Sequence, residues 1–384
     1  MKNMYYKDLL YKLILALLIS LPISVAVTSV LFAIMVLVYI AWCFEEKKIV
    51  FIPNQLDKFF LFYIALEFIT AFNSNYTIEA IIHSKRLLLI SFLYLVVLSF
   101  NTKKRIETAI YILAIVFAIV SLFEIGNYFI FIKDRLHIVH HPLTSSGMKM
   151  IVALFIIPYL FDKEIDFKNK SKLALLLFPI IISLLLTKSR SSLIAFVIGS
   201  FVIGVMYNRK IIYLTIFSII MFYLFAPQHL IDRVSSIYDL NHPNNIGRLN
   251  MWKTGIEMWK DKPILGFGDI DLYKIYIQYR VPTIAEPAGH LHNNFLQILV
   301  SMGLVGFTIV NLLFYKILQM EFNFFKKSES LFIKKIAITS LSIFTAFLIN
   351  GLFEWNFGDQ EIMILVWLSI GLAISAFNLE SEKI

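Results

Sequence analysis

Long apolar segments separated by short polar stretches run through most of this 384-residue chain. They show no alternation of period two, so they are typical of helices rather than of the strands of a barrel. Their lengths suit a bilayer, in which backbone groups must bond within the helix itself. The pattern predicts an all-α polytopic membrane protein with about twelve transmembrane helices. The predicted spans are residues 9–21, 23–43, 57–72, 87–100, 106–131, 143–161, 172–187, 191–207, 211–226, 293–315, 331–353 and 361–378.

One polar interval, residues 227–291, is much longer than the others and divides the chain. Nine predicted spans precede it in residues 1–226, and three follow it in residues 292–384. Lys and Arg concentrate in the loops on the side of the N-terminus, which is the asymmetry of cytoplasmic loops. The long interval is therefore expected to face outward, into the periplasm if the cell has one. The first span lacks a convincing cleavage site and is interpreted as a retained helix.

Composition agrees with this class, since 59% of the residues are hydrophobic, 16% are charged and the mean hydropathy is +0.77. Cytoplasmic Lys residues facing anionic headgroups explain most of the net charge of +9, so membrane lipids are expected partners. The outward basic residues are scattered, which argues against nucleic acid as a partner. Cys43, the only cysteine, excludes an intramolecular disulfide and is interpreted as an inert thiol. The outward basic residues at span ends are Arg86, Arg135, Arg190, Arg248 and Arg280.

A basic pair stands in the tight turn Thr187-Lys188-Ser189-Arg190 between two apolar spans. Ionisable groups near membrane depth are costly and are functional candidates by default, although both side chains could simply snorkel to the interface. A guanidinium group can donate two hydrogen bonds to phosphate oxygens at once. Arg190 is therefore a candidate diphosphate ligand, and Lys188 a candidate additional substrate contact.

Residues 247–259 predict an amphipathic helix inside the long polar interval. One apolar stripe of this helix consists of Leu249, Trp252, Ile256 and Trp259. Such a stripe most often anchors a helix at the membrane interface, where indole rings reach the headgroups. Arg248 stands at the N-terminal end, where helix N–H groups also favour an anion, and is a second candidate diphosphate ligand. Trp252 and Arg280 are candidate additional contacts.

His290-Leu291-His292-Asn293-Asn294 stands where the long interval meets the next span. A neutral imidazole is a natural general base for a sugar hydroxyl. His292 is favoured over His290 as the base because it adjoins the cap of the next helix, and the reverse assignment stays open. Asn293 or Asn294 is expected to cap that helix, and Asn293 is also a candidate substrate contact.

Several neighbouring features are given structural interpretations. No Cys or carboxylate accompanies His290 and His292 at a recognisable ligand spacing, so no metal site is expected. Gly303 and Gly306 are interpreted as close helix contacts, and Gly266-Phe267-Gly268 as a flexible turn. The remaining histidine cluster could bind substrate but is interpreted as a solvated loop; it contains His137, His140 and His141.

Together the three motifs resemble the O-antigen ligase family, which shares a fold and a signature with the O-antigen polymerases. The resemblance rests on Thr187-x-Ser189-Arg190, Gly247-Arg248-x-x-x-Trp252 and His290-x-His292-Asn293, in this order. The first half of the chain matches only in span count and hydropathy. The resemblance implies transfer of a glycan from undecaprenyl diphosphate to a sugar of lipid A core, on the periplasmic face of the inner membrane, without metal or other cofactor. It assigns Arg190 and Arg248 to the diphosphate, and His290 and His292 to the acceptor.

Two other functions remain open at the level of sequence. A polymerase of the same fold would differ only in its acceptor, which would be another lipid-linked chain. A transporter would suit the many spans, but it would not normally need a long outer loop ending in His-x-His. For a transferase we expect one direct displacement with inversion, because the carboxylate pair of retaining enzymes has no evident counterpart. Glu286 is the alternative base if neither histidine serves.

Overall fold

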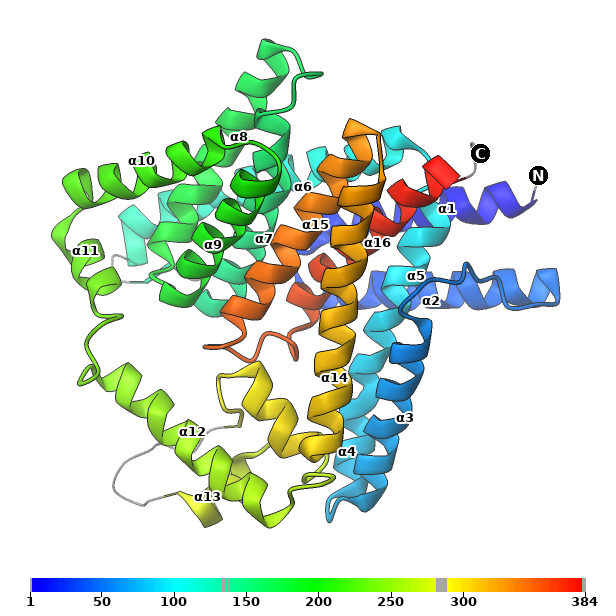
Figure 1. Ribbon diagram of the computed structural model, residues 1–384, viewed down its shortest axis with the longest axis vertical. Coiled ribbons are helices and arrows are strands. Elements are labelled where there is room, and N and C mark those ends of the chain that lie inside the picture. The colour runs from blue at the N-terminus through cyan, green and yellow to red at the C-terminus, as the bar shows by residue number, and fades with distance from the viewer. Residues whose placement is uncertain (1, 133–134, 137, 281–288, 382–384) are drawn as a thin grey trace.

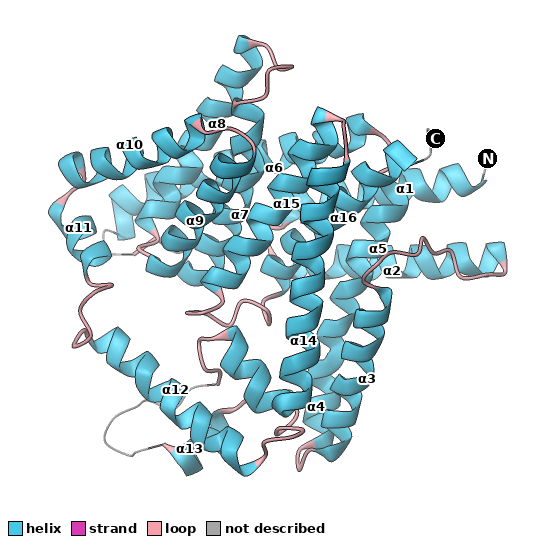
Figure 2. Ribbon diagram, in the orientation of Figure 1, coloured by secondary structure: helices cyan, strands magenta, loops and turns pink. Residues whose placement is uncertain are grey.

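The computed structural model describes residues 2–132, 135–136, 138–280 and 289–381. These residues form helices joined by loops, without a β-strand among them (Figures 1 and 2), which confirms the all-α prediction. The helices are α1 (Lys2–Ser20), α2 (Val25–Glu46), α3 (Asp57–Asn73), α4 (Thr77–His83), η1 (Ser84–Leu89), α5 (Ile90–Ser99), α6 (Lys103–Asn127), η2 (Tyr128–Ile132), α7 (Pro142–Leu160), α8 (Phe167–Leu186), α9 (Arg190–Met206), α10 (Lys210–Phe225), α11 (Gln228–Ser235), α12 (Pro243–Asp261), α13 (Tyr273–Tyr279), α14 (Asn294–Lys327), α15 (Leu331–Asn350) and α16 (Gln360–Ser381).

A helix occupies each of the predicted spans, but not every helix is long enough to be counted as a membrane span. In the described part of the chain, 8 helices are long and apolar enough to cross a bilayer. The apolar helices α9 and α10 have only 17 and 16 residues. The protein is thus a multi-pass membrane protein, while the predicted number of about twelve spans is not confirmed.

The centre of the molecule is built from α7, α15 and α16, whose side chains are buried almost all round. A helix that is apolar on every face is expected at the core of a bundle, and these three helices fit that rule. In contrast, α2 and α10 expose most of their apolar side chains, as helices in contact with lipid would. Figure 1 shows α10 and α11 at the edge of the molecule.

The long interval carries α11, α12 and α13, and Figure 1 shows α12 and α13 at the end of the molecule away from both chain termini. The predicted helix over residues 247–259 lies within α12, but α12 begins at Pro243. The prediction that Arg248 stands at the N-terminal end of this helix was therefore wrong. The face of α12 that packs against the protein contains Gly255 and Met258, and Gly255 lies against Leu291. Leu249 and Ile256, which belong to the predicted apolar stripe, are exposed.

The chain breaks its helical path inside α14, at Gly303, which has φ 62°. Residues 263–268 lie against this break, and the Phe267 amide donates to the Val300 carbonyl at 3.0 Å. A Cβ atom at residue 303 would overlap the Ile264 carbonyl, so only glycine fits there. Gly303 thus makes a close contact, but with the loop that follows α12 rather than with another helix as predicted. The prediction of a flexible turn was wrong, because residues 263–268 are bonded to the helix break.

Candidate active site

His290 and His292 lie side by side where the long interval enters α14, with ring centroids 4.3 Å apart and an interplanar angle of 66°. Asn293 caps α14, because its side-chain oxygen accepts a hydrogen bond from the Leu296 amide at 3.0 Å. His292 itself has a left-handed backbone with φ 47°. Such a conformation is uncommon for a residue with a Cβ atom, and residues with a strained backbone tend to cluster at functional sites.

A carboxylate that the sequence analysis missed completes the histidine pair. Glu354 stands in the turn between α15 and α16, and its Oε1 and Oε2 atoms lie 3.0 and 3.2 Å from His292 Nδ1. Only 6% of Glu354 is exposed. The sequence did offer a sign of this residue, because Glu354 is an acidic residue between two apolar spans. An ionisable group near membrane depth is costly and is a functional candidate, which holds for a carboxylate as it does for Lys188 and Arg190.

Asn293 and Asn294 join the histidine segment to the turn that carries Glu354. The Asn294 amide donates to the Gly351 carbonyl at 2.7 Å, and its side chain donates to Asn356 Oδ1 at 2.5 Å. The Asn293 side chain donates to the Leu352 carbonyl at 2.9 Å. Both ends of the Asn293 amide group are therefore engaged within the protein. Asn293 therefore acts as a structural cap, and its contact with substrate stays a prediction.

Burial and neighbouring charges set the protonation of this cluster. Burial lowers the pKa of His290 to about 4, and repulsion from His292 acts in the same direction. Burial alone would raise the pKa of Glu354, but the hydrogen bond from His292 and the nearby positive charges outweigh it and lower that pKa. Burial raises the pKa of Asp359, which lies farther along the turn that carries Glu354, to about 7. At neutral pH the cluster thus combines a neutral His290 with an ionised Glu354.

Arg248 reaches the same cluster from α12, with its Nη2 atom 3.9 Å from Glu354 Oε2. Burial lowers the pKa of Arg248, while Glu354 opposes that shift. An arginine remains charged under such conditions because its ordinary pKa lies above 12. One of the two predicted diphosphate ligands is thus next to the predicted catalytic histidines, although they are separated along the chain.

Arg190, the other predicted diphosphate ligand, starts α9 and is 6% exposed. Its Nη1 atom donates to the Ser236 carbonyl at 2.7 Å and to Ser236 Oγ at 2.9 Å, and its Nη2 atom donates to Asn245 Oδ1 at 2.7 Å. These acceptors are neutral, so they orient the guanidinium group without cancelling its charge. The side chain also holds the loop between α11 and α12, and it interacts electrostatically with Arg233 and Arg248.

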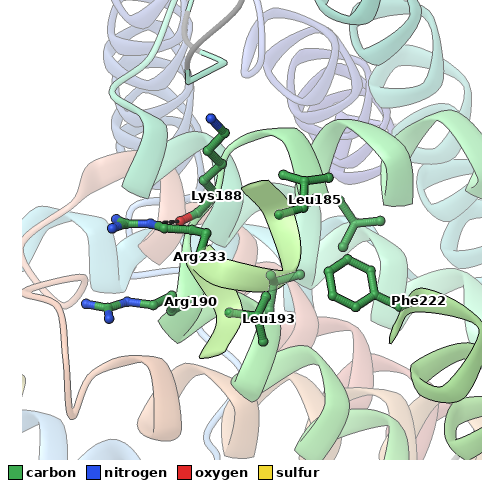
Figure 3. A pocket seen from close by; sticks show the side chains of 8 residues that line it. Leu185, Lys188, Arg190, Leu193, Phe222 and Arg233 are labelled. Carbon is green, nitrogen blue, oxygen red and sulfur yellow. Dashed lines mark hydrogen bonds between the residues drawn. The ribbon is translucent and has the colours of Figure 1, made fainter. Parts of the chain in front are cut away.

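A narrow crevice, with a cavity volume of only about 10 Å³, opens beside Arg190, between the turn that precedes α9 and the helices α10 and α11 (Figure 3). Lys188, which has φ 53°, lines it together with Arg233 of α11. The Lys188 carbonyl accepts a hydrogen bond from Arg233 Nε at 3.3 Å. In Figure 3 the side chains of Arg190 and Arg233 extend to the same side, whereas Lys188 extends in another direction. Arg233 is not among the site residues predicted from the sequence.

Two further predicted contacts, Trp252 and Arg280, lie on α12 and directly after α13. Trp252 packs its ring 6.3 Å from that of Phe353, the residue before Glu354, and within the described chain its buried Nε1 has no hydrogen-bond partner. Arg280 follows α13 and directly precedes residues 281–288. The roles of Trp252 and Arg280 as substrate contacts stay predictions.

The other histidine cluster has contacts within the protein. His140 is buried, and its Nε2 atom lies 3.0 Å from the Leu21 carbonyl, so the interpretation as a solvated loop was wrong for this residue. His141 caps α7, accepting a hydrogen bond from the Leu143 amide. His137 and Glu286 lie outside the described residues.

The same histidine and carboxylate groups are also a candidate donor set for a metal ion. Ligand atoms of His290, His292 and Glu354 lie within 4.8 Å of one another. The expectation that no carboxylate accompanies the two histidines was therefore wrong, because Glu354 does so. Electrostatics disfavour a metal ion at these groups. Arg248 already places a positive charge beside the Glu354 carboxylate and would repel the metal cation.

Comparisons with known proteins identify a family over part of the chain. The fold and the buried cluster define a multi-pass membrane protein with an arginine-rich histidine–carboxylate site. Residues 174–310 match the family model described as O-antigen ligase, and they contain all three sequence motifs, so the predicted family is confirmed over this segment. The chain is also 24% identical over 348 residues to a Rickettsia typhi protein named "Putative polysaccharide ligase", covering 87% of this chain and 78% of that protein. Glu354 lies beyond the matched segment.

Proposed function

We propose that this protein transfers a polysaccharide from undecaprenyl diphosphate to a sugar of lipid A core, on the periplasmic face of a bacterial inner membrane. The observation that carries the proposal is the contact of 3.0 Å between His292 Nδ1 and Glu354, with Arg248 on the same carboxylate. A base held by a carboxylate, next to fixed guanidinium groups, suits attack of a hydroxyl on a diphosphate-activated sugar. The family match over residues 174–310 supports it.

The contact with Glu354 gives the two nitrogens of His292 different roles. Because an ionised carboxylate only accepts hydrogen bonds, Nδ1 carries the proton and Nε2 carries the lone pair. Nε2 then takes the proton of the acceptor hydroxyl, and Glu354 stabilises the imidazolium that forms, as the aspartate does in a serine protease triad. His290 is a weak base at neutral pH because its pKa is lowered to about 4, and it suits positioning of the acceptor.

The arginines would act on the leaving group. As the acceptor oxygen bonds to the anomeric carbon, the bond from that carbon to the diphosphate oxygen breaks and negative charge develops on the diphosphate. Arg248 and Arg190 can stabilise this charge with hydrogen bonds that are strong in a site with little water. One displacement of this kind inverts the anomeric configuration. The donor is already activated, so the proposed reaction needs neither nucleotide nor metal.

A deletion strain tests the proposal. Loss of the protein should leave lipid A core without polysaccharide, while full-length chains accumulate on undecaprenyl diphosphate. A strain carrying the wild-type gene should restore capped lipopolysaccharide, and the His292→Ala variant should not. Accumulation of single repeats in place of long chains would assign the protein to polymerisation instead. Fully capped lipopolysaccharide in the deletion strain would contradict both activities.

A further inference from the structure

Arg86, one of the basic residues at span ends picked out in the sequence, lies between two carboxylates. Its Nη2 atom donates to Glu67 Oε1 of α3 at 3.3 Å, and its Nε atom lies 3.1 Å from Asp269 Oδ2. The side chains of Glu67 and Asp269 are only 0% and 6% exposed. A buried carboxylate is costly without a cation beside it, so these two groups hold the Arg86 guanidinium in place.

The same guanidinium contacts the turn that carries Glu354. Arg86 Cζ lies 5.4 Å from the ring centroid of Trp355, the residue after Glu354. The Trp355 amide donates to Glu354 Oε1 at 3.3 Å, and its indole lies 6.0 Å from the Phe357 ring. The indole also lies against Gly358, where a Cβ atom would overlap Nε1. The attraction between the cation and the indole therefore acts on the turn directly beside the carboxylate.

Asp269 belongs to the loop that joins α12 to α13, and this loop is bonded to both sides of the helix break at Gly303. Amide-to-carbonyl hydrogen bonds of 2.8–3.3 Å run from Phe267 to Val300, from Gly268 to Ser301, from Leu304 to Pro263 and from Val305 to Ile264. The indole of Trp259, near the end of α12, also donates to the Pro263 carbonyl at 3.2 Å. The loop therefore joins α12 to α14, and Arg86 contacts this loop at Asp269.

Arg248 depends on these connections more than the histidines do. The bonds of Asn293 and Asn294 already tie the histidine segment to the turn that carries Glu354. Arg248 reaches the same turn from α12, and its Nη2 atom stays 3.9 Å from Glu354 Oε2. Because Arg86 contacts both the turn and the loop that follows α12, it can set how far Arg248 stands from the carboxylate.

We propose that Arg86 is a positioning residue, which fixes α12, and with it Arg248, against the turn that carries Glu354. The proposal rests on the proposed function for the reaction that this placement serves. A displacement of about 1 Å, caused far from the reacting atoms, can lower a rate by roughly 10²-fold. Arg86 can therefore act on the rate through Arg248 without being a catalytic residue.

The kinetics of substituted full-length protein in lipid nanodiscs test this role. Arg86→Gln should lower kcat for transfer by roughly 10- to 100-fold with little change in the KM for the acceptor. Arg86→Lys, which keeps the charge, should restore part of the loss. The matched control is Lys274 of α13, which pairs with Glu79 of α4 at 3.3 Å but is 63% exposed. Lys274→Gln should keep the wild-type kcat, because a surface ion pair contributes little.

A double-mutant cycle distinguishes positioning from a general defect in folding. If Arg86 acts through Arg248, then Arg86→Gln should lower transfer by less than about twofold in an Arg248→Ala background. An equal loss in both backgrounds would overturn the proposal. The triple variant with Arg86→Met, Glu67→Gln and Asp269→Asn leaves no unpaired carboxylate, so it should accumulate in the membrane and keep its unfolding temperature. Its kcat should nevertheless fall as in Arg86→Gln, and a wild-type kcat would contradict the role of Arg86.

A distance measurement tests the placement without any transfer reaction. Spin labels on cysteines at Lys253, exposed on α12, and at Leu352, 38% exposed in the turn, report the separation of the two elements in a Cys43→Ala background. Arg86→Gln should broaden the distance distribution from double electron–electron resonance, and Lys274→Gln should not. An unchanged distribution in Arg86→Gln would refute the positioning role. If the distribution broadens in a protein that transfers no glycan, the positioning role stands and only the proposed function fails.

Discussion

His292 Nδ1 lies 3.0 Å from the Glu354 carboxylate, although 62 positions separate the two residues along the chain. The contact fixes which nitrogen of His292 is protonated and so which one can act as a base. Replacing Glu354 with Gln keeps the shape of the side chain but removes the charge that stabilises the imidazolium. Transfer by Glu354→Gln should therefore fall by roughly 10² to 10⁴ in kcat, measured with purified protein and a lipid-linked donor.

A matched control for this prediction lies on α12. Glu257 pairs with Lys260 at the surface and is 56% exposed on its side chain, so Glu257→Gln should retain wild-type transfer. Binding of the donor to Glu354→Gln should remain measurable, because the carboxylate acts on the histidine rather than on the diphosphate. Near wild-type kcat in Glu354→Gln would remove the carboxylate from the mechanism.

The two histidines should respond differently to substitution. His292→Ala should lower transfer by roughly 10² to 10⁴ without abolishing donor binding, since the base acts on the acceptor. The pH–rate profile should also lose the limb that reports the base. His290→Ala should mainly raise the KM for the acceptor, as expected for a positioning residue. Near wild-type rates in both variants at saturating acceptor would exclude both histidines as the base, and would turn attention to Glu286.

Much of this site could be read from the sequence because its motifs are local. The His-x-His-Asn segment, the turn with Arg190 and the helix that carries Arg248 each contain their own signal in hydropathy and residue type. The all-α class and the helical segments follow from the lengths of the apolar runs. Such signals need no knowledge of how the helices pack.

The contacts of Glu354 and Arg233 could not be predicted from the sequence because they join distant segments. Glu354 meets His292 only because α15 and α16 bring their connecting turn against the start of α14. Arg233 lies on α11 and donates a hydrogen bond to the Lys188 carbonyl, in a turn 45 positions earlier in the chain. The bonds of residues 263–268 to the break at Gly303 are likewise tertiary, so glycine content alone suggested flexibility there.

The pKa of His290 predicts how stability depends on pH. Burial lowers that pKa to about 4 from an ordinary value near 6.5. Above about pH 6.5 His290 is neutral in the folded and the unfolded state, so the protein keeps its full free energy of unfolding. As the pH falls toward 4, the unfolded state binds the proton more readily, and the free energy of unfolding decreases. The unfolding temperature of His290→Gln should fall less between pH 7 and pH 4 than that of the wild type. His229→Gln, an exposed histidine on α11, should keep the wild-type dependence, and the same dependence in His290→Gln would refute the assignment.

Arg190 and Arg248 should tolerate lysine poorly, because lysine keeps the charge but lacks the planar pair of donors. We expect transfer by Arg190→Lys and Arg248→Lys to fall strongly, and the Ala variants to fall further, by amounts corresponding to about 2–5 kcal/mol. Arg190 also holds Ser236 and Asn245, so its variants need a separate measurement of folding. Membrane accumulation and unfolding temperature provide it. Normal capping by both lysine variants would argue against bidentate binding of the diphosphate.

The arrangement of helices makes the proposed orientation testable. α12 and α13 lie at the end of the molecule away from both termini (Figure 1). The Lys and Arg asymmetry predicts that both termini and the loop after Lys327 are cytoplasmic, and that residues 238–286 are periplasmic. In a Cys43→Ala background, an impermeant thiol reagent should label a cysteine at Asn244 in cells with a permeabilised outer membrane. A cysteine next to Lys327 should react only after the inner membrane is disrupted, and the reverse pattern would invert the topology and place the histidine cluster on the cytoplasmic side.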